Sequence, residues 1–222
     1  MFHTVTAHPG ITQAAHRALP FVSNTDLSNL KNEALGLTRT GNPQALSFGV
    51  AFHEAVLEPH RYHAPQDLPP AQLQLLDTLA AAVRRQRYCR DLLYRGTAEL
   101  THTATHTETG LTVKIRPDLL VVTPRLGRRV LVDFKTTSCQ DYAHFVGTIE
   151  QYDYDRQAAF YSDVLGADRF LFVGVQKKAP YAIWLVELSA DAYSMEQGRK
   201  KYRRLLKLYA EQAAVPVSLA HL

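Results

Sequence analysis

Ile115-Arg116-Pro117-Asp118, separated by fourteen residues from Asp133-Phe134-Lys135, is the stretch that decides the expected fold and chemistry of this chain. In an extended strand, side chains two residues apart point to the same face, so Asp133 and Lys135 project together and Phe134 points to the opposite face. A tight turn between two antiparallel strands can bring Asp118 back beside Asp133. The strand around them is apolar, and a charged group near a core is costly unless it is paired or binds a metal. The pattern therefore predicts two carboxylates and an ammonium at one functional site.

Two carboxylates at one place are typical of a site for a divalent cation, because the cation relieves their mutual repulsion. Oxygen ligands with an ammonium nearby suit Mg²⁺, or Mn²⁺ as a substitute, better than Zn²⁺. Such a cation makes a bound water more acidic and neutralises charge on a phosphodiester, while Lys135 can orient that water or stabilise the charge at phosphorus. We therefore predict phosphodiester hydrolysis, with Asp118, Asp133 and Lys135 as catalytic residues. The alternative is an ordinary Asp–Lys pair on an edge strand, which the D-x-K motif alone would favour.

The segments around these motifs indicate an α/β fold. Hydrophobic periodicity and turn signals predict strands over residues 97–107, 111–122, 129–137, 169–176 and 180–188. Helices are expected over residues 25–35, from Ser47 to Glu58, over 71–88 and 154–165, and in a basic segment over 190–212. The connection from the strand at 129–137 to the strand at 169–176 is long enough for parallel pairing. We therefore expect a mixed central β-sheet flanked by helices.

Length and composition restrict the class of protein. The 222 residues are 46% hydrophobic and 21% charged, which predicts one globular domain over residues 1–222, with a weakly patterned segment at 1–22. The formal net charge of +4 is compatible with a polyanionic partner. No uncharged apolar run approaches the roughly 18 residues of a membrane helix, and we expect no signal peptide. Only two cysteines, Cys89 and Cys139, are present, which excludes a disulfide framework or a four-thiolate cluster and favours a reducing cytoplasm.

Beyond these arguments, Pro117-Asp118 with Asp133-Phe134-Lys135 resembles the PD-(D/E)xK nuclease superfamily. Further motifs in the same order make the resemblance more specific. They are Phe48-Gly49 with His53-Glu54 and Leu57-Glu58-Pro59, then Arg116-Pro117-Asp118, residues 133–137 and residues 154–161. Over residues 23–190 they resemble the RecE-type nuclease domain of exonuclease VIII and, more distantly, phage lambda exonuclease. The resemblance implies a restriction-endonuclease-like core and a Mg²⁺-dependent exonuclease that degrades linear double-stranded DNA from 5′ to 3′ in phage-type recombination.

The resemblance also implies roles for individual residues. The implied metal ligands are His53, Asp118, Asp133 and the carbonyl of Phe134, and Lys135 is the implied catalytic lysine. Supporting or DNA-binding roles are implied for Glu99, Arg116, Thr136, Gln157 and Tyr161. The implied partners are double-stranded DNA ends, a single-strand annealing protein and further copies of the chain in a trimeric or tetrameric ring.

Several of these residues have plain structural alternatives. His53 can be a core histidine, Glu99 a strand-end charge, and Gln157 and Tyr161 ordinary residues of one helix face. His102 and His106 share a strand face, but no third ligand at suitable spacing supports a zinc site. The basic runs at 84–95 and 199–207 can contact DNA phosphates, although a solvated helix face is the usual reading of such runs.

Two other functions remain open. The first is a catalytically inactive nuclease fold that binds DNA or protein, and the presence of Asp118, Asp133 and Lys135 together argues against it. The second is a structure-specific endonuclease on the same core, which the lack of an evident recognition domain disfavours.

Overall fold

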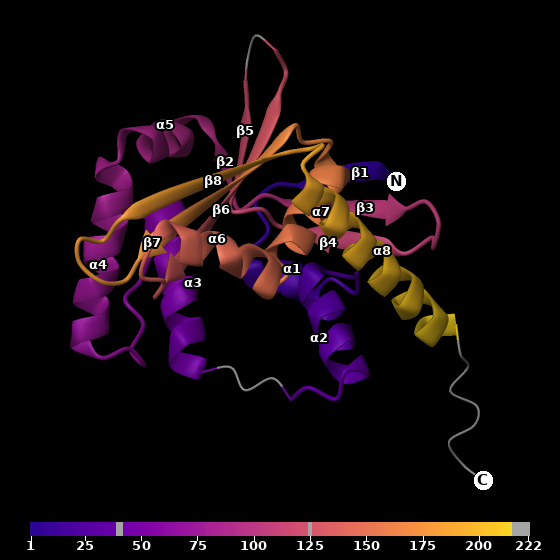
Figure 1. Ribbon diagram of the computed structural model, residues 1–222, viewed down its shortest axis with the longest axis horizontal. Helices are drawn as coiled ribbons and strands as arrows, with labels where there is room; N and C mark the ends of the chain where they lie inside the picture. Colours follow the sequence, from indigo (N-terminus) through magenta and orange to yellow (C-terminus); the bar gives the residue numbers. More distant parts are fainter. Residues whose placement is uncertain (39–41, 124–125, 215–222) are drawn as a thin grey trace.

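The computed structural model describes residues 1–38, 42–123 and 126–214, and it has the mixed α/β fold that the sequence predicts (Figure 1). In chain order, its elements are β1 (Phe2–His8), α1 (Gln13–Ala18), α2 (Asn24–Ala34), α3 (Pro43–Leu57), α4 (Pro70–Arg85), α5 (Arg87–Arg95), β2 (Thr97–Ala98), β3 (Thr101–His106), β4 (Thr112–Ile115), β5 (Leu119–Val122), β6 (Arg129–Thr137), α6 (Tyr142–Gln151), α7 (Tyr154–Leu165), β7 (Arg169–Gln176), β8 (Ile183–Ser189) and α8 (Tyr193–Ala214). Among the residues described, no helix has the length and apolar character required to cross a membrane.

The central sheet has five strands in the order β2-β5-β6-β7-β8. β6 and β7 are parallel, as predicted, and the other neighbouring strands in this sheet are antiparallel. Alternation along β6 buries Val132 and Phe134 in one apolar core, whereas Leu131 belongs to the core on the opposite face. Asp133 and Lys135 are on the same face as Leu131, which is covered by α7.

Helices cover both faces of this sheet, and each layer has its own core (Figure 1). α3, α4 and α5 pack on the face that carries Phe134, and α6, α7 and α8 pack on the other face. α8 crosses the first turn of α7 at Gly198, where a Cβ atom would collide with the carbonyl oxygen of Asp155. Glycine therefore allows the two helices to approach closely at this crossing.

A second sheet has the order β1-β3-β4, whereas the sequence predicts one central sheet. The predicted strand at 97–107 forms β2 and β3, and the strand at 111–122 forms β4 and β5, with the two halves of each in different sheets. The second break falls at Arg116-Pro117-Asp118, where Pro117 has no N–H for a ladder. The first break falls near Glu99, whose φ is 50° and whose N–H donates to the carbonyl of Asp118 at 3.1 Å. Both breaks thus meet at one point between the sheets.

Other predicted boundaries also differ from the structure. Residues 1–22 contain β1 and α1, and the predicted helix at 71–88 ends at Arg85, so that α5 is a separate helix. α6 was not predicted, α3 begins at Pro43 rather than at Ser47, and α8 covers Tyr193–Ala214 rather than 190–212. β1 escaped prediction because it is an edge strand with most of its residues exposed, so it lacks an apolar alternation.

Candidate active site

A cavity of about 1210 Å³ lies where the two sheets meet. Its walls come from α1, α2, α3 and α7, and its floor comes from the ends of β4 and β5 and from β6. The cavity brings together most of the predicted site residues: His53, Glu99, Arg116, Asp118, Asp133, Lys135, Gln157 and Tyr161. The side chains of Phe134 and Thr136 do not line it, because alternation along β6 turns both to the other face. The predicted ligand at Phe134 is its backbone carbonyl, and this role stays a prediction.

Asp133 and Lys135 form a close pair on β6, as the alternation predicts. The Nζ atom of Lys135 lies 2.8 Å from Oδ2 of Asp133 and 3.0 Å from Oδ1. Gln157 of α7 bridges the pair, since its Nε2 donates to Asp133 Oδ1 at 2.8 Å and its Oε1 accepts from Lys135 Nζ at 3.3 Å. The ammonium also lies 4.8 Å from the ring centroid of Tyr154. These contacts fix the lysine within the cavity.

The surroundings keep Lys135 charged. Burial alone would lower its pKa, but the negative charges of Asp133 and Asp118 outweigh burial and raise the pKa. Burial raises the pKa of Asp133, and the charge of Asp118 adds to this shift, whereas Lys135 opposes it. Burial also raises the pKa of Tyr161, so its phenol remains a protonated donor beside the pair.

Asp118 lies just before β5, and its carboxylate contacts both β6 and α3. Its Oδ2 accepts a hydrogen bond from the backbone N–H of Phe134 at 2.7 Å, and its Oδ1 lies 3.2 Å from Nδ1 of His53. Burial would raise the pKa of Asp118, but the charge and hydrogen bond of His53 outweigh it and lower the pKa. Burial would likewise lower the pKa of His53, and the same interaction with Asp118 raises it to about 9. The contact joins α3 to the carboxylate of Asp118, and a cation bound at these side chains would require the neutral imidazole.

Glu99 completes a group of possible metal ligands. One ligand atom each from His53, Glu99 and Asp118 lie within 4.8 Å of one another. In addition, Oδ2 of Asp133 is buried and accepts no hydrogen bond, although the Lys135 ammonium is near it. One imidazole nitrogen and several carboxylate oxygens suit a divalent cation of the Mg²⁺ or Mn²⁺ kind. This group differs from the predicted ligand set, because Glu99 rather than Asp133 accompanies His53 and Asp118.

Arg116 is engaged inside the protein and does not present a free charge. Its Nε donates to Oε2 of Glu99 at 2.6 Å, and its Nη1 donates to the carbonyl of Ile11 at 3.1 Å and to Oγ1 of Thr101 at 3.0 Å. Burial and the charge of Asp118 raise the pKa of Glu99 to about 7, although Arg116 opposes the shift. Arg116 therefore holds Glu99 in place and ties the N-terminal segment to the site.

No pattern in the sequence indicates that this N-terminal segment forms a wall of the cavity. Thr12, His16 and Arg17 from the region of α1 line it, and the buried Lys114 of β4 fixes the end of that helix. The ammonium of Lys114 donates to the carbonyls of Arg17 at 2.9 Å and Leu19 at 2.6 Å. Lys114 alternates with apolar residues in β4, a pattern that predicts an exposed lysine, so the sequence could not reveal this contact.

Most of the basic run on α8 is paired within the protein. Arg199 binds Asp163, and Lys207 lies 2.9 Å from Glu108. Lys201 contacts Asp153 and Asp155, as described below. Within the described part of the chain, Arg203 and Arg204 have no ion pair and are exposed. The run is therefore largely a set of contacts between α8 and its neighbours.

The two histidines of β3 are structural. Nδ1 of His102 lies 3.1 Å from the carbonyl of Leu100, and Nδ1 of His106 lies 2.9 Å from Oγ1 of Thr109. Both side chains are buried, and neither belongs to a group of potential metal ligands among the residues described.

A solved structure shares this fold, and others align with lower scores. A candidate exonuclease from Eubacterium rectale aligns with a TM-score of 0.63 at 16% identity, covering 94% of this chain and 89% of that one. A phage-related exonuclease from Haemophilus somnus 129PT aligns with a TM-score of 0.47 at 12% identity, covering 86% and 83% of the two chains. An alkaline exonuclease from Laribacter hongkongensis aligns with a TM-score of 0.42 at 14% identity, covering 90% and 93%.

Family comparison agrees with the fold. No curated protein matches the chain by sequence. Residues 27–215 match the model of a family described as a PDDEXK-like domain of unknown function, DUF3799. This match includes β6 and the elements that carry His53, Asp118 and Gln157. The chain therefore belongs to the PDDEXK-like DUF3799 family, and its fold and motifs are those of the PD-(D/E)xK nuclease superfamily.

Proposed function

We propose that this protein is a Mg²⁺-dependent deoxyribonuclease that hydrolyses phosphodiester bonds from the ends of linear double-stranded DNA, in the 5′ to 3′ direction. The observation that carries the proposal is the convergence of Asp118, Asp133 and Lys135 on the floor of one cavity, beside His53 and Glu99. Membership of a PDDEXK-like family supports the reaction class, and the likeness to a candidate exonuclease supports action at ends.

His53, Glu99 and Asp118 would hold the divalent cation, and Oδ2 of Asp133 is a further available ligand. When bound, the cation supplies a more acidic water and neutralises charge on the phosphodiester.

The remaining chemistry falls to Lys135 and its neighbours. Its charged ammonium stabilises the negative charge that develops when water attacks phosphorus. Asp133 and Gln157 hold the ammonium in one position, so the enzyme need not reorganise during the reaction. Lys135 is the proposed catalytic lysine, and Gln157 supports it.

The shape of the cavity favours a strand end as substrate. Helices α1, α2, α3 and α7 bound it on several sides, which suits a single strand that enters by its end better than an intact duplex lying across the site. The resemblance to RecE-type nucleases supports the 5′ to 3′ direction and a role in phage-type recombination beside a single-strand annealing protein.

Digestion of linear duplexes labelled separately at each 5′ and 3′ end tests the proposal, with a covalently closed circle in parallel. With Mg²⁺, the parent protein should release the 5′ label first and leave the circle intact. Lys135→Ala should abolish the digestion, whereas Lys178→Ala, which removes an exposed lysine outside the cavity, should not. Efficient cutting of the circle would indicate an endonuclease. Duplex binding without any cutting would indicate an inactive nuclease fold.

We also propose that the chain works as a single domain in a trimeric or tetrameric ring in the cytoplasm. A ring would keep a small enzyme on its DNA without high intrinsic affinity. Light scattering at micromolar concentration tests this assembly, and a monomer would contradict it.

A further inference from the structure

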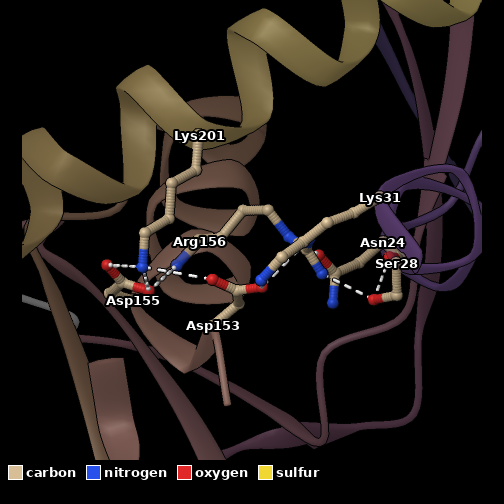
Figure 2. Close-up of polar contacts among 7 residues, drawn as sticks. All are labelled: Asn24, Ser28, Lys31, Asp153, Asp155, Arg156 and Lys201. Atoms are coloured by element: carbon tan, nitrogen blue, oxygen red, sulfur yellow. Dashed lines mark hydrogen bonds and ion pairs between the residues drawn. The ribbon is translucent and has the colours of Figure 1, made fainter. Parts of the chain in front are cut away.

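A group of buried and half-buried polar side chains joins α2, α7 and α8 (Figure 2). We call it the anchor cluster, and it comprises Asn24, Ser28, Lys31, Asp153, Asp155, Arg156 and Lys201. Its centre is Arg156, which is only 2% exposed. Nε of Arg156 donates to Oδ1 of Asn24 at 3.1 Å, and Nη2 donates to Oγ of Ser28 at 2.6 Å. These two bonds fasten α7 to the first turns of α2.

The charged pairs of the cluster fix the same helices at further points. Asp153 Oδ2 accepts from Lys31 at 2.5 Å, which ties the last turn of α2 to the start of α7. Asp153 Oδ1 lies 3.1 Å from Nζ of Lys201, and Asp155 lies 2.9 Å from the same atom, which ties α8 to this turn. α2 is thus held to α7 near both of its ends.

The contact with Arg156 decides which way the Asn24 amide points. A guanidinium only donates hydrogen bonds, so the amide of Asn24 must turn its oxygen toward Arg156 and its NH₂ group away. Asn24 lines the cavity that holds Asp133 and Lys135, and its Nδ2 has no hydrogen-bond partner among residues 1–38, 42–123 and 126–214. A fixed, unused donor group is therefore present in the cavity wall.

Two backbone N–H groups at the start of α2 already have hydrogen-bond partners. The Ser23 side chain accepts from the backbone N–H of Asp26, and the Asp26 side chain accepts from the backbone N–H of Ser23. These reciprocal bonds form a capping box, which uses backbone donors at the helix start. Among the described residues, the backbone N–H groups of Asn24 and Thr25 have no hydrogen-bond partner, and the side-chain amide of Asn24 is the further donor that Arg156 orients.

We propose that Asn24 contacts the DNA substrate through its NH₂ group, which donates to an oxygen of the sugar–phosphate backbone, and that Arg156 is the positioning residue that orients it. This inference rests on the proposed nuclease function. Backbone oxygens are the same at every nucleotide, so the contact would orient the strand without reading its sequence. The turn of α7 that supplies Arg156 also supplies Gln157, which bridges Asp133 and Lys135. One turn of helix therefore sets both the reacting lysine and a contact on the opposite wall.

Asn24→Asp is the decisive variant, because a carboxylate keeps the acceptor for Arg156 and replaces the donor by a repelling charge. The Kd for a short linear duplex, measured with Ca²⁺ in place of Mg²⁺, should rise about tenfold or more, the scale of one hydrogen bond to a charged group. KM should rise likewise, with a smaller change in kcat and no loss of thermal stability. Asn29→Asp, an exposed change on the same helix, is the matched control and should leave the Kd unchanged.

A double-variant cycle tests the role of Arg156. Arg156→Lys keeps the charge but cannot hold Asn24 and Ser28 together, so duplex binding should weaken. If Arg156 acts through Asn24, adding Asn24→Ala to Arg156→Lys should cause little further loss. Fully additive losses would overturn the positioning role.

The outcomes separate this inference from the proposed function. A parent protein that binds duplex but cuts nothing refutes the nuclease activity, and the Kd of Asn24→Asp still decides the contact. A parent that cuts, together with Asn24→Asp that binds and cuts equally well, overturns the contact alone. A parent that binds no duplex overturns both.

Discussion

The cavity floor and the anchor cluster both hold carboxylates among charged side chains, yet the pKa values of Asp133 and Glu99 on the floor shift in the opposite direction to that of Asp153 in the cluster. Asp118, which pairs with His53, shifts in the same direction as Asp153. Burial opposes ionisation of Asp153, but hydrogen bonds from Lys31 and Lys201 outweigh it and hold its pKa below the usual range. On the cavity floor, burial raises the pKa of Asp133 and raises that of Glu99 to about 7. A carboxylate with a lowered pKa stabilises the fold at neutral pH, whereas one with a raised pKa costs stability.

The opposite pKa shifts distinguish a cluster that stabilises the fold from a cavity that is the candidate reaction site. Arg156 and Gln157 are neighbours in sequence, but Arg156 belongs to the anchor cluster and Gln157 to the cavity floor. The anchor cluster has two carboxylates and three basic groups, and these form ion pairs with one another. The cavity floor has acceptors that a cation would satisfy. Changes at the floor should therefore alter activity, and changes to the charged pairs of the anchor cluster should alter stability. Asn24, which also lines the cavity, is the cluster member for which we predict an effect on DNA binding.

The largest effect is expected for Asp118→Asn. This change removes a negative charge from the centre of the proposed metal site, so both Mn²⁺ affinity and the cleavage rate should fall severely. Calorimetry of Mn²⁺ binding and single-turnover cleavage measure the two effects, and Asp77→Asn, on an exposed face of α4, is the control. Normal metal binding and activity in Asp118→Asn would show that the site is wrongly assigned.

Lys135→Ala should separate the rate from metal binding. The lysine repels a cation, so Mn²⁺ affinity should be unchanged or higher after its removal. The single-turnover rate should still fall by about 10²–10³-fold or more, the usual scale for one electrostatic stabiliser. Duplex binding with Ca²⁺ should survive. A variant that cleaves like the parent would remove Lys135 from the mechanism.

Arg156→Ala should reduce stability most among changes in the anchor cluster. It removes the donor to Asn24 and Ser28, weakens the pairing of Asp153, which keeps Lys31 and Lys201, and opens a cavity. Together these changes cost about 3–5 kcal/mol of unfolding free energy. Urea unfolding measures the loss, with Arg204→Ala as an exposed control that should change stability by no more than about 0.5 kcal/mol. Equal stability of the two variants would contradict the stabilising role of the cluster.

Asp153→Asn should have a smaller effect that depends on pH. Its partly exposed lysine partners limit the loss to about 1–2 kcal/mol at pH 7. Because the folded pKa is lowered, the contribution is fully present above the unfolded value of about 3.9 and is lost as the pH falls through the folded pKa. Urea unfolding at pH 7 and at successively lower pH below 4 should show the two proteins converging. Asp91→Asn, which removes an exposed ion pair with Arg95, should show little loss at pH 7.

Sequence reasoning worked best where a short motif and a simple alternation agree. The alternation in β6 predicted that Asp133 and Lys135 share a face, and the hairpin with β5 brings Asp118 next to them. The parallel pairing of β6 with β7 followed from the length of their connection. These features depend on residues that are near in sequence or on one well-defined strand.

The features that escaped prediction depend on contacts between distant segments. The anchor cluster combines Asn24, Asp153 and Lys201, which are far apart in the chain and belong to no motif. The division into two sheets depends on pairing partners, so the breaks near Glu99 and at Pro117 could not be inferred from local propensity. The use of Arg116 and Lys114 as internal braces likewise depends on where the N-terminal segment lies.

The close crossing of α8 and α7 at Gly198 offers a way to make the function of this protein depend on temperature. A single methyl group there would press on the carbonyl of Asp155, in the turn that also carries Gln157. The disturbance would begin on the outer helix and would reach Lys135 through that turn. Gly198→Ala is therefore the natural place to seek a heat-sensitive protein, one that works in the cold and loses its function on mild warming.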